Sequence, residues 1–146
     1  MERIVVGVDG SQGARAALAW ALDEARLRQA GVEVVHAWHP PYVTEMPYTA
    51  GYLAISPDFH PDAFEAEARA LLDQVVGGAN TTGVPSVEPV LVRDHAAGAL
   101  LDVAKGAELL VVGARGRGGV AGLLLGSVSQ QVVHHAPCPI VVVPSG

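Results

Sequence analysis

Short apolar runs alternate along this chain with longer segments in which apolar residues recur every three or four positions. The five runs lie within residues 3–8, 32–38, 84–93, 107–113 and 139–144. Runs of this kind are typical of strands that are buried on both faces of a sheet. We expect the third strand to be interrupted near Pro89, because proline donates no hydrogen bond to a neighbouring strand.

The segments between the runs have the spacing of amphipathic helices. In the first segment Ala14, Leu18 and Leu22 recur at this spacing, Ser11 suits the N-cap, and Gly31 is expected to end the helix. Asp94 and Ser127 are expected to cap the third and fourth helices in the same way. The four expected helices run from Ser11 to Gly31, from Pro61 to residues 77–83, from Asp94 to about Lys105, and from Ser127 to about His135.

Strands that alternate with helices imply an α/β fold with an open parallel sheet of five strands and helices on both faces. A chain of 146 residues has the length of one domain, so residues 1–146 are expected to form a single domain. In such sheets, ligands bind beyond the carboxyl ends of the strands, where the strand order reverses. The first strand ends at Asp9 and Gly10 and the fourth at Gly113. These ends would face one crevice if the two strands are neighbours.

Composition and charge narrow the function classes. Nine Lys and Arg residues against fifteen Asp and Glu residues give a formal net charge of −6. This balance argues against a nucleic-acid binder, which carries a basic face. No apolar stretch approaches the ~20 residues that cross a bilayer, and the first residues lack a signal-peptide pattern, so we expect a cytoplasmic protein with no membrane partner. The lone cysteine, Cys138, has no partner for a disulfide or a metal and is expected in the core.

Residues 39–60 contain four prolines and show no periodic pattern. We expect a long loop here. Loops of this length are uncommon inside compact domains and tend to be functional or mobile. The sequence leaves the role of this loop open.

Six glycines lie between Gly113 and Gly126, behind an apolar run and ahead of a helix. Glycine loses more backbone freedom on folding than any other residue, so this concentration indicates that the backbone must approach something closely. The helix that follows begins with unpaired N–H groups and a partial positive charge, which suit a phosphate. Arg115 and Arg117 are the only charged residues within residues 109–146. We therefore expect a ligand that carries phosphate.

Two widespread phosphate-binding motifs do not account for these glycines. The P-loop pattern needs a lysine before serine or threonine, and the only lysine, Lys105, precedes a glycine. A G-x-G-x-x-A pattern occurs at Gly116, Gly118 and Ala121. It lacks the acidic residue expected about 20 residues later, where the sequence reads "HAPCPIVVVP".

The remaining pattern is G-x2-G-x9-G-[ST], formed by Gly113, Gly116, Gly126 and Ser127. With this pattern the chain resembles the universal stress proteins of the ATP-binding kind. The resemblance runs nearly end to end, through "VVGVDGS", "VVHAW", "LLVVGARGRGG" and "LLLGSVSQQVVHHAPCPIVVV". It implies the strand order 3-2-1-4-5, with ATP bound across the point where that order reverses. Residues 93–95 depart from the glycine and proline often found there, which affects packing more than the nucleotide.

The resemblance also implies the roles of the site residues. Asp9 would meet the ribose or a metal on the phosphates, for which Mg²⁺ is the candidate, and Ala37 would offer backbone to the adenine. No catalytic residue is implied. The full set of expected nucleotide-binding residues is Gly7, Asp9, Ala37, Val112, Gly113, Gly116, Gly126, Ser127, Val128 and Ser129.

Structural explanations compete with some of these roles. Asp9 could simply cap the turn into the first helix, Gly7 could be required by packing, and Ser129 could be a helix-surface serine. Ser127 could serve as an N-cap and as a phosphate ligand together. His134 and His135 are adjacent on a helix and therefore diverge by about 100°, which argues against a shared metal.

The expected function is that of an ATP-binding stress-response protein, a nucleotide-dependent regulator rather than a dedicated enzyme. Hydrolysis needs a group that positions water near the γ-phosphate, and Asp9 is the only acid expected near the site. The alternatives are a slow ATP-hydrolysing or adenylate-transferring enzyme that uses the same crevice, and a nucleotide-free dimeric interaction module. The fifth strand, apolar throughout, is expected to join two copies in a homodimer.

Overall fold

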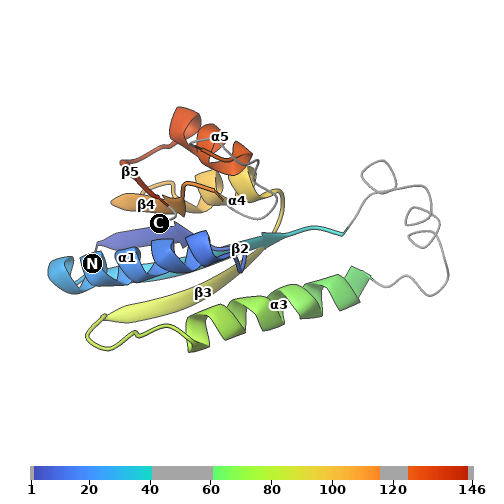
Figure 1. The fold of residues 1–146 in the computed structure, drawn as a ribbon, viewed down its shortest axis with the longest axis horizontal. Helices are drawn as coiled ribbons and strands as arrows, with labels where there is room; N and C mark the ends of the chain where they lie inside the picture. The colour runs from blue at the N-terminus through green and yellow to red at the C-terminus, as the bar shows by residue number, and fades with distance from the viewer. Residues whose placement is uncertain (1, 41–60, 116–124, 145–146) are drawn as a thin grey trace.

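A computed structural model of the chain describes residues 2–40, 61–115 and 125–144. Its sheet has five parallel strands in the order β3-β2-β1-β4-β5, which confirms the predicted α/β fold and strand order (Figure 1). The strands are β1 (Arg3–Gly7), β2 (Gly31–Trp38), β3 (Ser86–Arg93), β4 (Leu109–Gly113) and β5 (Ile140–Val143). The helices are α1 (Gln12–Arg28), α3 (Pro61–Gly77), α4 (Ala96–Val103) and α5 (Ser127–His135).

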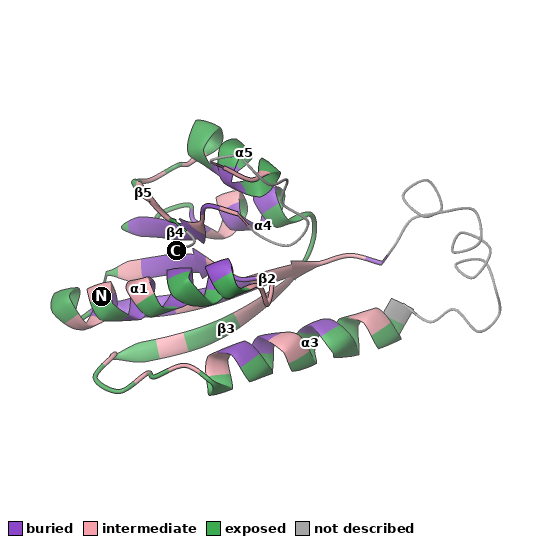
Figure 2. Ribbon diagram, in the orientation of Figure 1, coloured by how far each residue is buried: buried purple, intermediate pink, exposed green. Residues whose placement is uncertain are grey.

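The helices form two layers, one on each face of the sheet. The face under α1 and α3 contains Ile4 and Val6 of β1, whereas Val5 packs with α4 on the other face. All three side chains are fully buried, and the buried residues concentrate on the central strands (Figure 2). This two-sided burial explains why the strands are continuous apolar runs without alternation.

The start of α1 was predicted correctly, but its end was not. The hydroxyl of Ser11 accepts a hydrogen bond from the N–H of Ala14 at 3.1 Å, as expected of an N-cap. The helix ends at Gln29, which takes the left-handed conformation with φ 53°. Gly31, predicted as the helix end, is instead the first residue of β2 and pairs with Arg3. The side-chain amide of Gln29 donates to the carbonyl of Arg26, which gives a helix-end carbonyl a partner without glycine.

The predicted interruption at Pro89 was wrong. β3 continues through this residue, which pairs with Val34 of β2. β3 is an edge strand, and every second residue of an edge strand directs its N–H away from the partner strand. A proline at such a position removes no ladder hydrogen bond.

The predicted cap of α4 was also wrong. His95 is the N-cap residue, and no side chain caps the helix. The carboxylate of Asp94 accepts a hydrogen bond from the N–H of His95 at 2.7 Å, which occupies it one residue before the helix. The helix ends at Val103, ahead of the predicted Lys105.

Within the described part of the chain, every helix is too short or too polar to cross a membrane. Residues 41–60, which form most of the expected long loop, lie outside the described residues.

Candidate functional site

The carboxyl ends of β1 and β4 lie side by side in the middle of the sheet. The two strands pair in parallel, with Val6 opposite Val111. β1 therefore delivers Asp9 to the same edge of the sheet as the segment after Gly113. This confirms the expected meeting of the two strand ends. Gly116, another predicted site residue, lies outside the described residues.

Asp9 organises the turn between β1 and α1. Its carboxylate Oδ1 accepts a hydrogen bond from the N–H of Ser11 at 2.9 Å, and Gly10 between them has a φ of 82°. A positive φ favours glycine, so the Asp9-Gly10 pair suits this turn. Asp9 thus has the turn-capping role considered from the sequence. That role fixes its half-buried carboxylate beyond the end of β1.

The start of α5 provides a group of backbone donors. Gly126 is the N-cap, with φ −76° and ψ 173°, and within the part of the chain that the structure describes no side chain caps the helix. Ser127 is therefore the first helical residue and is exposed, not the N-cap that we predicted. The first N–H groups of a helix have no acceptor within it, and they carry the positive end of the helix dipole. This end of α5 suits an anion.

The N-terminus of α5 is held against the end of β4. The N–H of Gly126 donates to the carbonyl of Ala114 at 2.7 Å. One turn later, the hydroxyl of Ser129 donates to the carbonyl of Gly113 at 2.6 Å. Ser129 is buried, with 4% of its surface exposed, so it is not a surface serine. We did not predict this hydrogen bond from the sequence. A serine in the first turn of a helix, on the face that packs against the sheet, is the feature that could have indicated it.

Gly113 is required by close packing as well as by its place at the strand end. A Cβ at this position would lie 2.9 Å from the carbonyl oxygen of Gly13 in the first turn of α1. The start of α1 can therefore pack directly on the end of β4. We did not identify Gly13 from the sequence. The feature that could have indicated this contact is a pair of glycines, one in the first turn of a helix and one at the end of a strand, since two glycines allow close packing.

Two further predicted residues face the core rather than the crevice. A Cβ on Gly7 would lie 2.7 Å from the end of the Leu100 side chain of α4, so glycine there leaves room for that side chain. The Val112 side chain is buried in the same core layer as Leu100. Only the backbone of these two residues is available to a ligand.

Ala37 lies at the end of β2, beside a pocket of about 280 Å³ between that strand and α3. His36 also lines this pocket, and its Nδ1 lies 2.9 Å from the carbonyl oxygen of Val8. This contact links the end of β2 to the end of β1. The pocket is therefore next to the crevice that contains Asp9.

Among the described residues, no group of three His, Cys, Asp or Glu side chains could hold a metal ion. The His134 and His135 rings lie 6.5 Å apart and are tilted by 60°. Asp9 could hold a divalent cation only together with ligand oxygens, as Mg²⁺ commonly binds through one carboxylate and substrate phosphates. Cys138 packs with the core as expected, and burial raises the pKa of its thiol.

Comparison with known proteins gives one consistent result. Residues 1–144 match the model of the universal stress protein family. A universal stress protein of Mycobacterium tuberculosis is 38% identical over 139 residues, which are 95% of this chain and 44% of the relative. The chain thus spans less than half the length of that relative. A Thermus aquaticus universal stress protein is 38% identical over 143 residues, which are 96% of both chains.

Solved structures match the fold over almost its whole length. A universal stress protein in complex with cAMP has a TM-score of 0.72 and 26% identity, and the match covers 99% of this chain and 98% of that one. The universal stress protein of Archaeoglobus fulgidus in complex with dAMP has a TM-score of 0.66 and 26% identity. That match covers 97% of each chain.

Proposed function

This chain belongs to the universal stress protein family, and on that basis we propose that it binds ATP beyond the ends of β1 and β4. In this proposal it acts in the cytoplasm as a nucleotide-dependent regulator of a stress response. The observation that carries the proposal is the start of α5. No side chain of the described residues caps this helix, and its first N–H groups lie at the same edge of the sheet as Asp9.

The phosphates would bind at the start of α5. Gly126 adopts a conformation open to any residue, so glycine there serves close approach rather than an unusual turn. The N–H groups of Ser127, Val128 and Ser129 would donate to phosphate oxygens, and the exposed hydroxyl of Ser127 would add a further donor. Ser129 would contribute its backbone only, because its hydroxyl already donates to the Gly113 carbonyl.

The nucleoside would lie across the ends of β1, β2 and β4. The backbone of Ala37 would meet the adenine beside the pocket between β2 and α3. The backbones of Val112 and Gly113 would lie beneath the ribose and base, and glycine at positions 7 and 116 would permit close approach of the nucleotide. The universal stress proteins solved with cAMP and dAMP, both 26% identical to this chain, support an adenine nucleotide as the ligand class.

Asp9 would act on the ribose or on a Mg²⁺ ion held by the phosphates. Bound Mg²⁺ would neutralise phosphate charge there. Because the Asp9 carboxylate also holds the N–H of Ser11, it is fixed in place before any ligand arrives. In residues 7–11, 113–115 and 125–130 Asp9 is the only acidic residue, so a second carboxylate that could activate water is missing from these segments. We therefore propose that ATP is bound and turned over slowly at most.

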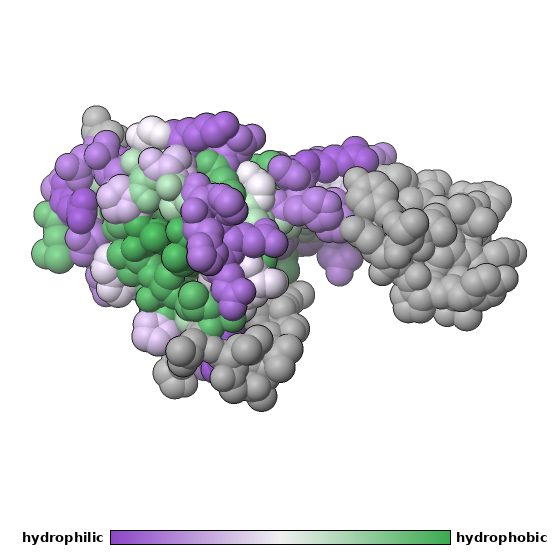
Figure 3. All heavy atoms as spheres, turned by 90° about the horizontal axis from the view of Figure 1, so that it is seen from above, coloured by the Kyte–Doolittle hydropathy of each residue, from purple (hydrophilic) through white to green (hydrophobic). Residues whose placement is uncertain are grey.

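The regulatory role would involve a homodimer formed through β5. This strand lies at an edge of the sheet, and its residues Ile140 to Val143 are all apolar and half-buried. Apolar residues gather on the side of the molecule where α5 and β5 lie (Figure 3). Val128 and Val133 of α5 are exposed apolar residues.

The experiment that tests the function is direct ligand analysis. Purified protein is denatured, the released small molecules are identified by mass spectrometry, and binding of ATP, ADP, AMP and GTP is measured by calorimetry. We expect an adenine nucleotide to copurify and ATP to bind more tightly than GTP. Protein that copurifies with no nucleotide and binds none of the four would instead favour the interaction module.

A further inference from the structure

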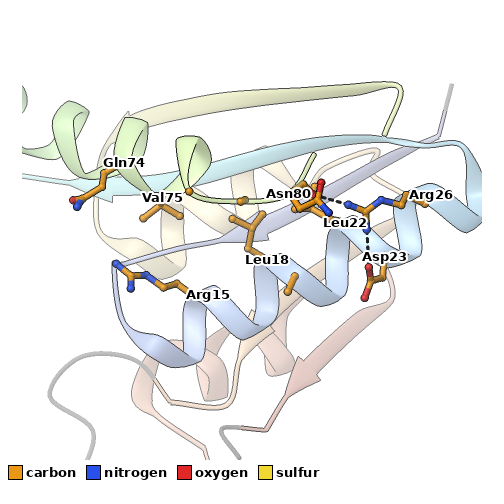
Figure 4. Close-up of a pocket in the computed structure, with 11 residues that line it drawn as sticks. Arg15, Leu18, Leu22, Asp23, Arg26, Gln74, Val75 and Asn80 are labelled. Atoms are coloured by element: carbon orange, nitrogen blue, oxygen red, sulfur yellow. Dashed lines mark hydrogen bonds and ion pairs between the residues drawn. The ribbon is translucent and has the colours of Figure 1, made fainter. Parts of the chain in front are cut away.

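A groove lies between α1 and α3 on the sheet face away from α4 and α5 (Figure 4). Its volume is about 490 Å³, within the roughly 300–1,000 Å³ of small-molecule sites. Leu18 and Leu22 of α1 and Val75 of α3 form its apolar floor, and each has 6% or less of its surface exposed. The nucleotide crevice proposed above uses none of these residues.

Small residues keep the groove open. Ala19 of α1 lines one wall, and Gly78 and Ala79, which follow α3, line the other. Larger side chains at these positions would fill the space between the helices. The two helices instead pack separately on the sheet, α1 over β1 and β4 and α3 over β2 and β3.

The two ends of the groove differ in charge. At one end the guanidinium of Arg26 donates to Asp23 and to the carbonyl of Thr82, each at 2.6 Å, and also to the carbonyl of Asn80. Its positive charge is paired, and each of its three nitrogens donates a hydrogen bond. At the other end the exposed guanidinium of Arg15 has no hydrogen-bond or ion-pair partner in the described part of the chain. Gln74 lies at the same end as Arg15 (Figure 4).

An unpaired guanidinium at one end of an apolar groove is complementary to a molecule with one acid group and an aliphatic body. We propose that this groove binds a free aliphatic monocarboxylate. Its carboxylate would pair with Arg15, and its tail would lie on Leu18, Leu22 and Val75. A ligand with one acid group fits better than one with two, because Arg26, the only other cation among the described residues that line the groove, is already paired with Asp23. A guanidinium binds a carboxylate through two parallel hydrogen bonds, which would orient the ligand along the groove.

The test uses decanoate as the probe, with decanol and acetate as the matched molecules that lack the charge or the tail. Binding is measured by calorimetry at neutral pH, and the site is located from chemical-shift changes in NMR spectra of labelled protein. We expect decanoate to bind more tightly than decanol and acetate, with the largest changes around Leu18, Leu22 and Val75. Arg15→Gln should weaken decanoate binding about two- to fivefold, because an ion pair with an exposed arginine contributes modestly. It should leave decanol unchanged.

Two further variants distinguish binding in this groove from non-specific binding of decanoate to the protein. Arg69→Gln removes an exposed arginine of α3 that does not line the groove, and it should leave decanoate binding unchanged. Ala19→Leu fills the groove from an exposed helical position and should abolish binding while circular dichroism shows an intact fold. Equal decanoate affinity in the Arg15→Gln and Arg69→Gln variants would overturn the proposal. Chemical-shift changes centred on the start of α5 would also overturn it. So would changes in the groove that depend on protein concentration alone, because these would indicate a contact between two copies of the chain.

Discussion

The hydroxyl of Ser129 in α5 donates a 2.6 Å hydrogen bond to the carbonyl oxygen of Gly113 at the end of β4. The same glycine lies against Gly13 of α1, because a Cβ on Gly113 would be 2.9 Å from the Gly13 carbonyl oxygen. Gly113 therefore joins the starts of two helices to one strand end. The proposed phosphate site depends on this arrangement, since it holds the N-terminus of α5 beside the turn that contains Asp9.

Ser129→Ala should lower the free energy of unfolding by about 1–3 kcal/mol, because the Gly113 carbonyl loses the donor that satisfies it. Urea unfolding monitored by circular dichroism measures the change. The matched control is Ser127→Ala, which removes an exposed hydroxyl of the same helical turn and should change stability by less than about 0.5 kcal/mol. Equal stability of the two variants would show that the Ser129 hydroxyl has no structural role.

Gly113→Ala should destabilise the fold by about 1–3 kcal/mol, since the new methyl group would force α1 away from β4. Gly77→Ala provides the opposite case. A Cβ on Gly77 meets nothing within 4 Å, so that variant should be stabilised by about 0.4–1 kcal/mol through its less flexible unfolded chain. If both substitutions change the urea midpoint in the same direction, the contact between Gly113 and Gly13 does not limit the packing.

The sequence predicted those parts of the fold that depend on local pattern. The apolar runs located the strands, and Ser11 located the start of α1. The predictions that were wrong concern residues whose role depends on partners distant in the sequence or on an unusual backbone conformation. Gln29 ends α1 in a left-handed conformation that usually selects glycine, and Pro89 is tolerated because β3 is at the sheet edge.

The site was predictable as a position but not in its internal contacts. The spacing of Gly113, Gly126 and Ser127 predicted a phosphate-binding turn, and the structure brings Gly113 and the start of α5 to the same edge of the sheet as Asp9. The bond from Ser129 to Gly113 spans 16 residues and arises only when α5 packs on β4. Gly7 illustrates the same limit, because its contact with Leu100 depends on where α4 lies.

Gly126→Glu should weaken ATP binding by more than about a hundredfold, roughly 2.7 kcal/mol. A carboxylate at this N-cap would occupy the end of α5 where the phosphates are proposed to bind, and it would repel them. The fold should survive, because Gly126 has an extended backbone that other residues adopt. Calorimetry with ATP measures the loss of affinity. Gly126→Ala is the control, because it adds a side chain at this position without adding charge. A folded Gly126→Glu protein with unchanged ATP affinity would remove the phosphate site from the proposed function.

Purified protein should bind Mg-ATP but turn it over far more slowly than the ~1–10³ s⁻¹ of ordinary enzymes. Asp9→Asn tests the metal role, because asparagine keeps an oxygen that can accept from the Ser11 N–H but loses the charge. We expect this variant to bind ATP more weakly than wild type in the presence of Mg²⁺ and comparably in EDTA. Turnover within the range of ordinary enzymes that disappears in Asp9→Asn would favour the alternative of an ATP-hydrolysing enzyme.

The two edges of the sheet are protected differently, and this difference underlies the prediction of a homodimer. β3 carries Glu88, Pro89 and Arg93 at exposed positions, and charged residues and proline prevent edge pairing. β5 has four apolar residues and no charge, and Pro139 and Pro144 limit its length. A short apolar edge suits one defined partner, and two copies related by a two-fold axis could each cover the other's strand.

Val142→Lys should therefore yield a monomer in which ATP binding is weakened but retained, because a lysine on each copy would place like charges across the proposed interface. Sedimentation velocity at micromolar concentration, with and without ATP, measures the oligomeric state. Leu27→Lys is the control, since Leu27 is the most exposed large apolar residue described, at 83%, and lies on α1 and not on β5. That variant should remain dimeric. Because β5 follows α5 directly, a dimer that dissociates or tightens when ATP is added would connect the proposed phosphate site to the interface. Wild-type protein that is monomeric with and without ATP would rule the interface out.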